Sequence, residues 1–589
     1  LGGLTVGTIK EDGTEITSPN EITLKTPLPI IGQDGFETKV KRTPDILMND
    51  GTTKKGGYTG YKVGMILTEK DTDNEVNNTN KYSLINKGTI EFNGKRSVGI
   101  DVYAPSKEIY KSGNDNNPPF TNATIDVLND KDGIIAINGY DSYGMRLSSY
   151  VNKLERFENK GTINVGNDKI ETNNYGVNFG SVGMGVQTNY FTEHGLAAPA
   201  EDFDKNKFGS GYIGKVKNSG TINIYGKGNT AMKLDNDSVY TDTYYTKLLY
   251  NVNVVTNGDK NGKGTINLYG TKNLGLNAGE GSNFLEWQTG IHYFTMSRVT
   301  NNGTINVYGK GNVAMNAGGT AALNQAINLE KGTINLKGNN NIAMWTFFFE
   351  SEGSNSFRNF QNKYDLGPGN IINKGTIKSE GGENLTAMAI VGDLDGANTG
   401  TIDLRGKGVV GVYNTSRISG YDKDTGEPVA DGKSIFKMIA GDDPNKNPKI
   451  NVVGENSIAV YSKGILNDTY LERGDISAHD GAVALYSDRT AIELGKKGSS
   501  TIDMTNSPNL SVSGKSEKIP AIMFYNYTYR DYKTAGFSTE EIVLEHPIAK
   551  GSFILNNDVN ATIGKYGIAF YLIGKDGAKK TEILNNMFP

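Results

Sequence analysis

The sequence predicts an all-β protein that folds as a right-handed parallel β-helix, a solenoid of stacked coils with long loop insertions. The first observation is a Gly-Thr-Ile tripeptide whose copies begin at Gly88, Gly161, Gly220, Gly264, Gly303, Gly332, Gly375 and Gly400. The second is a small residue between apolar neighbours that follows each copy, as in Val98-Gly99-Ile100. Self-similarity at this density is typical of repeat architectures, and parallel strands joined by crossovers favour the right-handed form.

The repeat at residues 301–315 illustrates why one copy needs neighbours. Ile305 and Val307 point to the same face of a strand because side chains alternate along it. Gly309 and Gly311 then supply turn geometry that a Cβ would obstruct, and a second short strand follows. A unit this short has one apolar face and two open edges, so it is stable only between copies of itself.

Composition agrees with an elongated core. The chain has 589 residues, which exceeds what one compact core usually holds. It contains 75 glycines, and only 36% of its residues are hydrophobic, as expected where many turns surround a thin core. The formal net charge of −4 argues against a nucleic-acid partner. The absence of cysteine excludes disulfides and thiolate metal sites.

The chain divides into two predicted regions. Residues 1–60 are irregular in pattern and either cap the solenoid or join it to something upstream. Residues 61–589 form the β-helix, with coils of about 24 residues where the spacing is shortest. Insertions interrupt the repeat near 101–122, 179–217, 235–262, 280–301, 346–372, 413–448 and 526–556.

Two columns of stacked side chains are expected inside the coils. The isoleucines of the tripeptide should form one of them, because equivalent residues of parallel strands lie above one another. Asparagines at a fixed offset before the tripeptide form the other: Asn86, Asn159, Asn218, Asn301, Asn373 and Asn398. These asparagines either form an amide ladder or merely tolerate the turn geometry.

Aromatic residues in or beside the insertions are the candidate ligand-binding groups, because tyrosine and tryptophan give large, rigid contact areas. The candidates are Tyr240, Tyr244, Tyr245, Trp287, Tyr293, Tyr527 and Tyr529. The alternative is that these rings pack the insertions down on the solenoid.

A second candidate is Arg473-Gly474-Asp475, the tripeptide that integrins recognise on many ligands. Its alternative explanation is the repeat itself, since Gly474-Asp475-Ile476 falls where Gly-Thr-Ile falls elsewhere. A strand also presents such a triplet less well than a loop tip.

No catalytic, metal or cofactor motif is found, so we expect a protein that is not an enzyme. The four histidines lie far apart and lack metal-binding spacing. Parallel β-helices do include polysaccharide lyases and hydrolases, which use clustered acidic residues. Asp393 with Asp395, and Asp422 with Asp424, are the only alternating acidic pairs considered for that role.

The repeats at 218–232 and 301–315 resemble those of the large type V autotransporter adhesins of fusobacteria. The galactose-inhibitable and arginine-inhibitable outer-membrane adhesins belong to that group. The resemblance implies an extracellular passenger at the bacterial surface, anchored in the outer membrane by a C-terminal barrel that this chain does not include. It further implies binding to a host-cell receptor or galactose-type glycan and contact with partner bacteria, without mapping any binding residue.

The function expected from these observations is cell adhesion, with insertions presented on a rigid β-helical rod. One alternative is a polysaccharide lyase or hydrolase on the same fold. Another is a passive spacer within a larger adhesin. No cofactor and no nucleic acid is expected.

Overall fold

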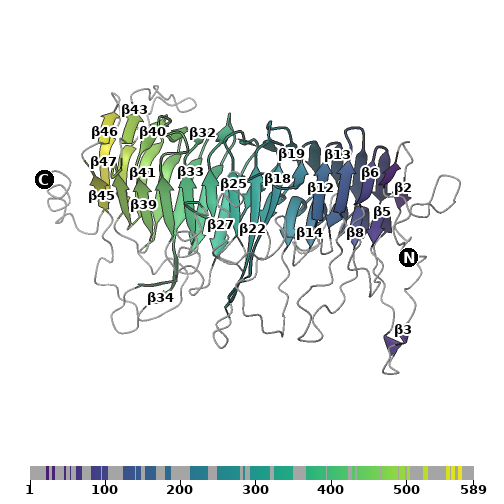
Figure 1. Ribbon diagram of the computed structural model, residues 1–589. Helices are drawn as coiled ribbons and strands as arrows, with labels where there is room; N and C mark the ends of the chain where they lie inside the picture. The colour runs from purple at the N-terminus through teal and green to yellow at the C-terminus, as the bar shows by residue number, and fades with distance from the viewer. Residues whose placement is uncertain are drawn as a thin grey trace, which may run out of the picture. The chain divides into compact units, whose positions relative to one another are not determined.

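Each Gly-Thr-Ile copy lies in the middle one of three short strands that together make one coil. In the computed structural model one such coil consists of β6 (Lys81–Asn86), β7 (Thr89–Asn93) and β8 (Ser97–Tyr103). The next coil pairs with it strand by strand, in parallel and in register. The chain is therefore a right-handed parallel β-helix whose coils stack through three parallel sheets, which we number 1, 2 and 3 in chain order (Figure 1).

The structure describes the following residues, and no helix occurs among them: 21–24, 30–32, 46–47, 53–54, 62–68, 81–93, 96–103, 124–139, 141–147, 153–166, 180–187, 212–235, 249–278, 283–285, 292–318, 324–348, 367–392, 394–421, 428–431, 434–464, 467–488, 490–497, 500–504, 522–527, 552–556, 559–563 and 568–573. They fall into two compact units, described separately here, with the boundary between Ile305 and Asn306.

In unit 1, sheet 1 contains β1 (Glu21–Leu24), β6, β9 (Thr124–Asn129), β12 (Lys153–Asn159), β15 (Val216–Asn218), β18 (Leu249–Asn257) and β22 (His292–Asn301). Sheet 2 contains β2 (Ile30–Gly32), β7, β10 (Ile134–Asn138), β13 (Thr162–Val165), β16 (Thr221–Ile224) and β19 (Thr265–Leu268). Sheet 3 contains β5 (Lys62–Thr68), β8, β11 (Tyr143–Leu147), β14 (Val182–Gln187), β17 (Thr230–Asp235) and β20 (Leu274–Ala278). β3 (Ile46–Leu47) pairs antiparallel with β4 (Thr53–Lys54), β21 (Asn283–Leu285) does so with β22, and β23 (Thr304–Val307) crosses the boundary.

In unit 2, sheet 1 contains β25 (Gln325–Asn328), β28 (Ile371–Asn373), β31 (Asp395–Asn398), β36 (Ile435–Met438), β39 (Asp468–Leu471), β42 (Ala491–Leu494) and β45 (Ser552–Leu555). Sheet 2 contains β26 (Thr333–Leu336), β29 (Thr376–Ser379), β32 (Thr401–Arg405), β37 (Lys449–Val453), β40 (Gly474–His479), β43 (Ser500–Met504) and β46 (Val559–Ile563). Sheet 3 contains β24 (Val313–Asn316), β27 (Ile342–Phe348), β30 (Thr386–Gly392), β33 (Val410–Thr415), β38 (Ile458–Lys463), β41 (Val483–Asp488), β44 (Ile522–Tyr527) and β47 (Ile568–Ile573). A hairpin of β34 (Arg417–Tyr421) and β35 (Pro428–Asp431) lies outside the three sheets.

The isoleucine column is confirmed within each unit. Ile222 pairs in register with Ile163 and Ile266, and all three are 0% exposed. The tripeptide threonine and the residue after isoleucine are only half-buried, because they point away from the core. In unit 2 the same column runs through Ile334, Ile377, Ile402, Ile450, Ile476 and Ile502.

The small residue of sheet 3 is explained by this column. A Cβ placed on Gly99 would lie 2.5 Å from the Gly144 oxygen and 2.6 Å from Cγ2 of Ile135. The isoleucines of sheet 2 therefore press against the sheet 3 backbone at this position. In β14 the position is held by Gly183.

The asparagines form the amide ladder. In unit 1 each Nδ2 donates to the Oδ1 of the next asparagine at 2.7–2.8 Å, through Asn86, Asn129, Asn159, Asn218, Asn257 and Asn301. In unit 2 Asn328, Asn373 and Asn398 continue the pattern at 2.8 Å. These amides are 0% exposed, so the ladder pairs polar groups that water cannot reach.

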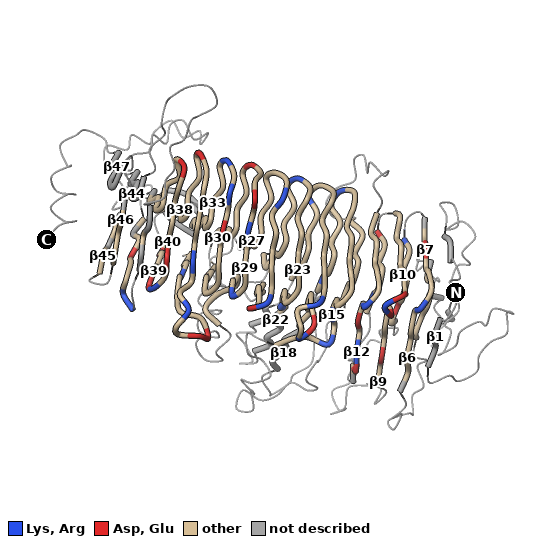
Figure 2. Tube along the Cα trace, turned by 90° about the horizontal axis from the view of Figure 1, so that it is seen from above, with Lys and Arg blue, Asp and Glu red and all other residues tan. Residues whose placement is uncertain are grey.

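Each coil has three strands, whereas the repeat pattern had indicated two. The strand missed belongs to sheet 1, and its copies share little: those from β6 to β31 end in asparagine, whereas β36, β39, β42 and β45 do not. Residues 1–60, predicted to be irregular, contain β1 and β2, which pair in parallel with β6 and β7. Figure 2 shows charged residues mainly along the turns and the edges of the coils.

Candidate functional site

Each of the seven predicted insertion ranges includes a connection at one kind of corner, where the chain leaves sheet 3 of one coil and enters sheet 1 of the next. We call this the insertion corner. For example, range 101–122 begins in β8 and ends just before β9, and range 526–556 joins β44 to β45. The corner between sheets 1 and 2 is tight in most coils, as in Asn86-Lys87-Gly88. The described strand ends that flank these connections therefore lie along one edge within each unit.

Five predicted insertion ranges include whole strands: β14 in 179–217, β18 in 235–262, β21 and β22 in 280–301, β34 to β36 in 413–448, and β45 in 526–556. Four of these strands, β18, β22, β36 and β45, belong to sheet 1 and lack the Gly-Thr-Ile pattern. The inserted segments at these corners are correspondingly shorter than predicted.

The aromatic candidates are placed only in part. Tyr293 lies in β22, opposite Phe284 of β21 in the antiparallel pair. Tyr527 is the last residue of β44, in register with Asp488 and Ile573. The others lie outside the described residues: Tyr240, Tyr244, Tyr245, Trp287 and Tyr529.

A file of tyrosines on sheet 3 of unit 2 was not predicted. Tyr413, Tyr461 and Tyr486 occupy the same register position on successive strands. Their ring centroids are 5.2 Å and 4.6 Å apart, within the range of favourable aromatic pairs. The register continues the file through Tyr525 and Tyr571. The signal was a tyrosine two residues after the small residue, as in Gly411 to Tyr413.

Arg473-Gly474-Asp475 belongs to the coil rather than to a loop tip. Asp475 pairs in register with Lys449 and Thr501, in the tripeptide threonine position, and its amide donates to the Pro448 oxygen at 2.9 Å. Gly474 is buried, and a Cβ there would lie 2.4 Å from Cε of Met438. Arg473 Nε donates to Asn447 Oδ1 at 2.6 Å. The repeat thus explains the glycine and the aspartate position.

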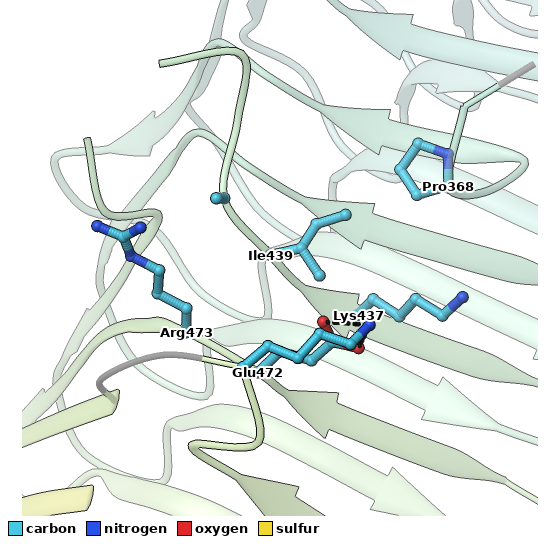
Figure 3. Close-up of a pocket in the computed structure, with 7 residues that line it drawn as sticks. Pro368, Lys437, Ile439, Glu472 and Arg473 are labelled. Carbon is cyan, nitrogen blue, oxygen red and sulfur yellow. Dashed lines mark hydrogen bonds and ion pairs between the residues drawn. The ribbon is translucent and has the colours of Figure 1, made fainter. Parts of the chain in front are cut away.

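Arg473 also lines an open pocket of about 330 Å³ on unit 2 (Figure 3). Lys437 reaches it from β36, Glu472 and Arg473 from the turn after β39, and Lys497 from the turn after β42. Apolar lining comes from Pro368, Ile439 and Ala440. Three cationic side chains therefore face one carboxylate in a pocket that sequence reasoning missed, because its residues come from separate coils.

The carboxylate of this pocket is already paired. Glu472 is 8% exposed and accepts a hydrogen bond from Lys497 Nζ at 3.1 Å. Next to it on sheet 1, Tyr470 donates its hydroxyl proton to Asp468 Oδ2 at 2.7 Å. Burial and this hydrogen bond hold the pKa of Tyr470 well above its ordinary value, so the phenol stays neutral at physiological pH.

Catalytic and metal sites are not found in the part of the chain that the structure describes. No group of three or more histidine, aspartate or glutamate side chains there could hold a metal ion. Of the acidic pairs considered for catalysis, only Asp395 is described; it is 3% exposed within β31. Among the same residues, no helix is long and apolar enough to cross a membrane.

Comparison with known proteins identifies no relative: no family model, no curated protein and no solved structure matches the chain.

Proposed function

We propose that this chain is part of a bacterial cell-surface adhesin of the fusobacterial autotransporter type, in which the insertion corner contacts a host receptor or a galactose-type glycan. The observation that supports the proposal is that each of the seven predicted insertion ranges includes a connection at that corner. Parallel sheets hold the coils together, so the strand ends that flank these connections share one edge in each unit. Binding residues are commonly found on loops held by such a scaffold.

Repetition gives this arrangement a second property. Several inserted segments on one chain, and many chains on one cell, allow weak individual contacts to add up by avidity. The same display would suit coaggregation with partner bacteria. Surface location and an outer-membrane anchor belong to the proposal through the resemblance of the repeats.

The test is binding of the purified chain to epithelial cells, immune cells and partner bacteria, with galactose or arginine as competitor. Loop replacement identifies the binding edge. The chain itself contains a short connection at the insertion corner that can serve as the replacement, because β41 and β42 are joined by only Arg489 and Thr490. Replacing residues 236–248 or 528–551 with such a two-residue link should abolish or strongly reduce binding.

A matched control removes a long connection that lies elsewhere on the coil. Residues 505–521 join sheet 2 to sheet 3, between β43 and β44, and the four-residue turn 454–457 offers a natural replacement. This control should bind as the wild type does. Equal loss in both kinds of variant would refute the insertion corner as the contact. Absence of binding to every cell type would favour the spacer, and product release from glycans would favour the enzyme.

A further inference from the structure

We propose that the pocket beside Arg473 binds an acidic oligosaccharide, with Lys437 and Arg473 each contacting a separate anionic group of the same chain. The lining takes Pro368 from the range 346–372 and Lys437, Ile439 and Ala440 from the range 413–448. None of its residues belongs to the segments replaced in the adhesion test, so the two proposals can be tested separately. The inference rests on the charges that line the pocket, on their partners and on the closed hydrogen bonding of the strands beneath.

The charge balance favours an anion. Of the four charged side chains in the lining, Glu472 and Lys497 pair with each other at 3.1 Å. Lys437 has no ion-pair partner among the described residues. The guanidinium of Arg473 uses Nε for Asn447 and directs its terminal nitrogens away from that bond. The positive charges of Lys437 and Arg473 are therefore not neutralised within the pocket. The pocket is partly enclosed, and charge-assisted contacts there are stronger than in open water.

The arrangement of the two cations favours an extended ligand. Figure 3 shows Arg473 and Lys437 pointing to opposite sides of the pocket, with Glu472 between them. One carboxylate cannot serve both groups in this geometry, whereas successive acidic sugars of one oligosaccharide present anions at intervals. Ile439 and Pro368 supply apolar contacts suited to the C–H face of a pyranose ring.

The strands beneath the pocket argue for a saccharide over a peptide. β36 is hydrogen-bonded on both sides, to β31 and β39, and β39 is likewise bonded to β42. An extended peptide gains most of its affinity by adding to a free strand edge, and none is open here. Recognition must therefore come from side chains, which suits an anionic sugar.

The experiment uses the full chain and a hyaluronan hexasaccharide, which alternates glucuronate with N-acetylglucosamine. Chitohexaose is the neutral control, free glucuronic acid is the single-anion probe, and hexaglutamate is the peptide arm. Titration calorimetry at two salt concentrations should show binding of the hexasaccharide that weakens with salt. Chitohexaose should not bind detectably.

Two substitutions test the assignment of the cations. Lys437→Gln and Arg473→Gln should each weaken hexasaccharide binding roughly tenfold, and the double variant should weaken it by the product of both, because the contacts are separate. Binding of glucuronic acid should respond to only one of them. Arg473→Lys, which keeps the charge, should retain most affinity. Lys407→Gln, an exposed site on another turn, is the matched control.

Several outcomes overturn the proposal. One is equal binding of chitohexaose and the hexasaccharide. Another is unchanged affinity in both glutamine variants while their circular dichroism matches wild type. Tighter binding of hexaglutamate than of the hexasaccharide would instead assign the pocket to an acidic peptide. Loss of cell adhesion in loop-replacement variants with intact hexasaccharide binding would separate the two proposals.

Discussion

Substituting Asn218 by alanine tests whether the buried amide ladder stabilises the stack of coils. Asn218 Oδ1 accepts a hydrogen bond from Asn159 at 2.7 Å, and its Nδ2 donates to Asn257 at 2.8 Å and to the Thr265 oxygen at 3.2 Å. Alanine removes all three bonds at a site that is 0% exposed.

The expected loss of unfolding free energy depends on which hydrogen bonds the neighbouring asparagines retain. Nδ2 of Asn159 retains the oxygens of Gly161 and Thr221, both at 3.3 Å. Oδ1 of Asn257 loses the donor that reaches it from Asn218, and a buried acceptor left unsatisfied costs on the order of 1–3 kcal/mol. With the lost bonds, Asn218→Ala should lower the local free energy of unfolding by about 3 kcal/mol.

A matched control lies five residues away in the same coil. Asn223 also stacks between two asparagines, accepting from Asn267 at 2.8 Å and donating to Asn164 at 2.9 Å. It is only half-buried, so water can replace its bonds, and Asn223→Ala should cost about 0.5–1 kcal/mol.

Native-state hydrogen exchange is the suitable assay, because a long repeat protein need not unfold in one step. Amides of β16 and β19 report the opening of the affected coils. Their protection should fall about a hundredfold in Asn218→Ala and by less than about fivefold in Asn223→Ala. Equal losses in the two variants would show that the asparagines serve the turns alone and would refute the stabilising role of the ladder.

Three further predictions concern the core, a turn and a buried phenol. Ile222→Ala should lower the free energy of unfolding of its coil by about 2–5 kcal/mol. Ile134→Ala, at a 39% exposed position of β10, should cost less than about 1 kcal/mol. Similar losses of hydrogen-exchange protection in the two variants would contradict the assignment of Ile222 to the core and Ile134 to the surface. Gly220→Ala should destabilise the protein more than Gly228→Ala, by about 1–3 kcal/mol. A Cβ on Gly220 would lie 2.2 Å from the Gly161 oxygen, whereas a Cβ on Gly228 would have nothing within 4 Å and only the positive φ of Gly228 opposes a side chain. Urea titration of both variants checks the order. In the folded protein, burial and Asp468 raise the pKa of Tyr470 from 10.0, so its contribution to stability is fully present below pH 10.0 and declines as the pH rises further. The difference in unfolding free energy between wild type and Tyr470→Phe should therefore change above pH 10.0. A difference that does not depend on pH would be evidence against the raised pKa.

The sequence was sufficient for sheets 2 and 3, because packing inside the coil restricts those residues. Isoleucine recurs where Ile222 and Ile266 stack, and a small residue such as Gly99 lies beside this column in most coils. These constraints leave a repeating pattern that can be read without structure.

The strands of sheet 1 were not predicted because their sequences do not repeat in the same way. They differ in length and content, from Asp395–Asn398 to His292–Asn301, and the final asparagine of these two strands is absent from β36, β39, β42 and β45. The turn after that asparagine also varies, from one residue before Gly88 to six before Gly264. Asn129, Asn257 and Asn328 were missed because a fixed offset to the tripeptide was assumed.

The pocket and the tyrosine file depend on register between coils, which sequence does not display. Lys437 and Arg473 are brought together because β36 pairs with β39, although an insertion of arbitrary length could separate them in the chain. Tyr413 and Tyr461 align for the same reason.

The insertion corner has a consequence for engineering. β42 aligns residue for residue with β39 after a two-residue link from β41, and β45 aligns equally well with β42 after a far longer excursion from β44. The hydrogen bonding between adjacent strands is therefore the same for short and long connections at that edge. Foreign peptides could be grafted there one coil at a time, with any disturbance confined to the two adjoining coils.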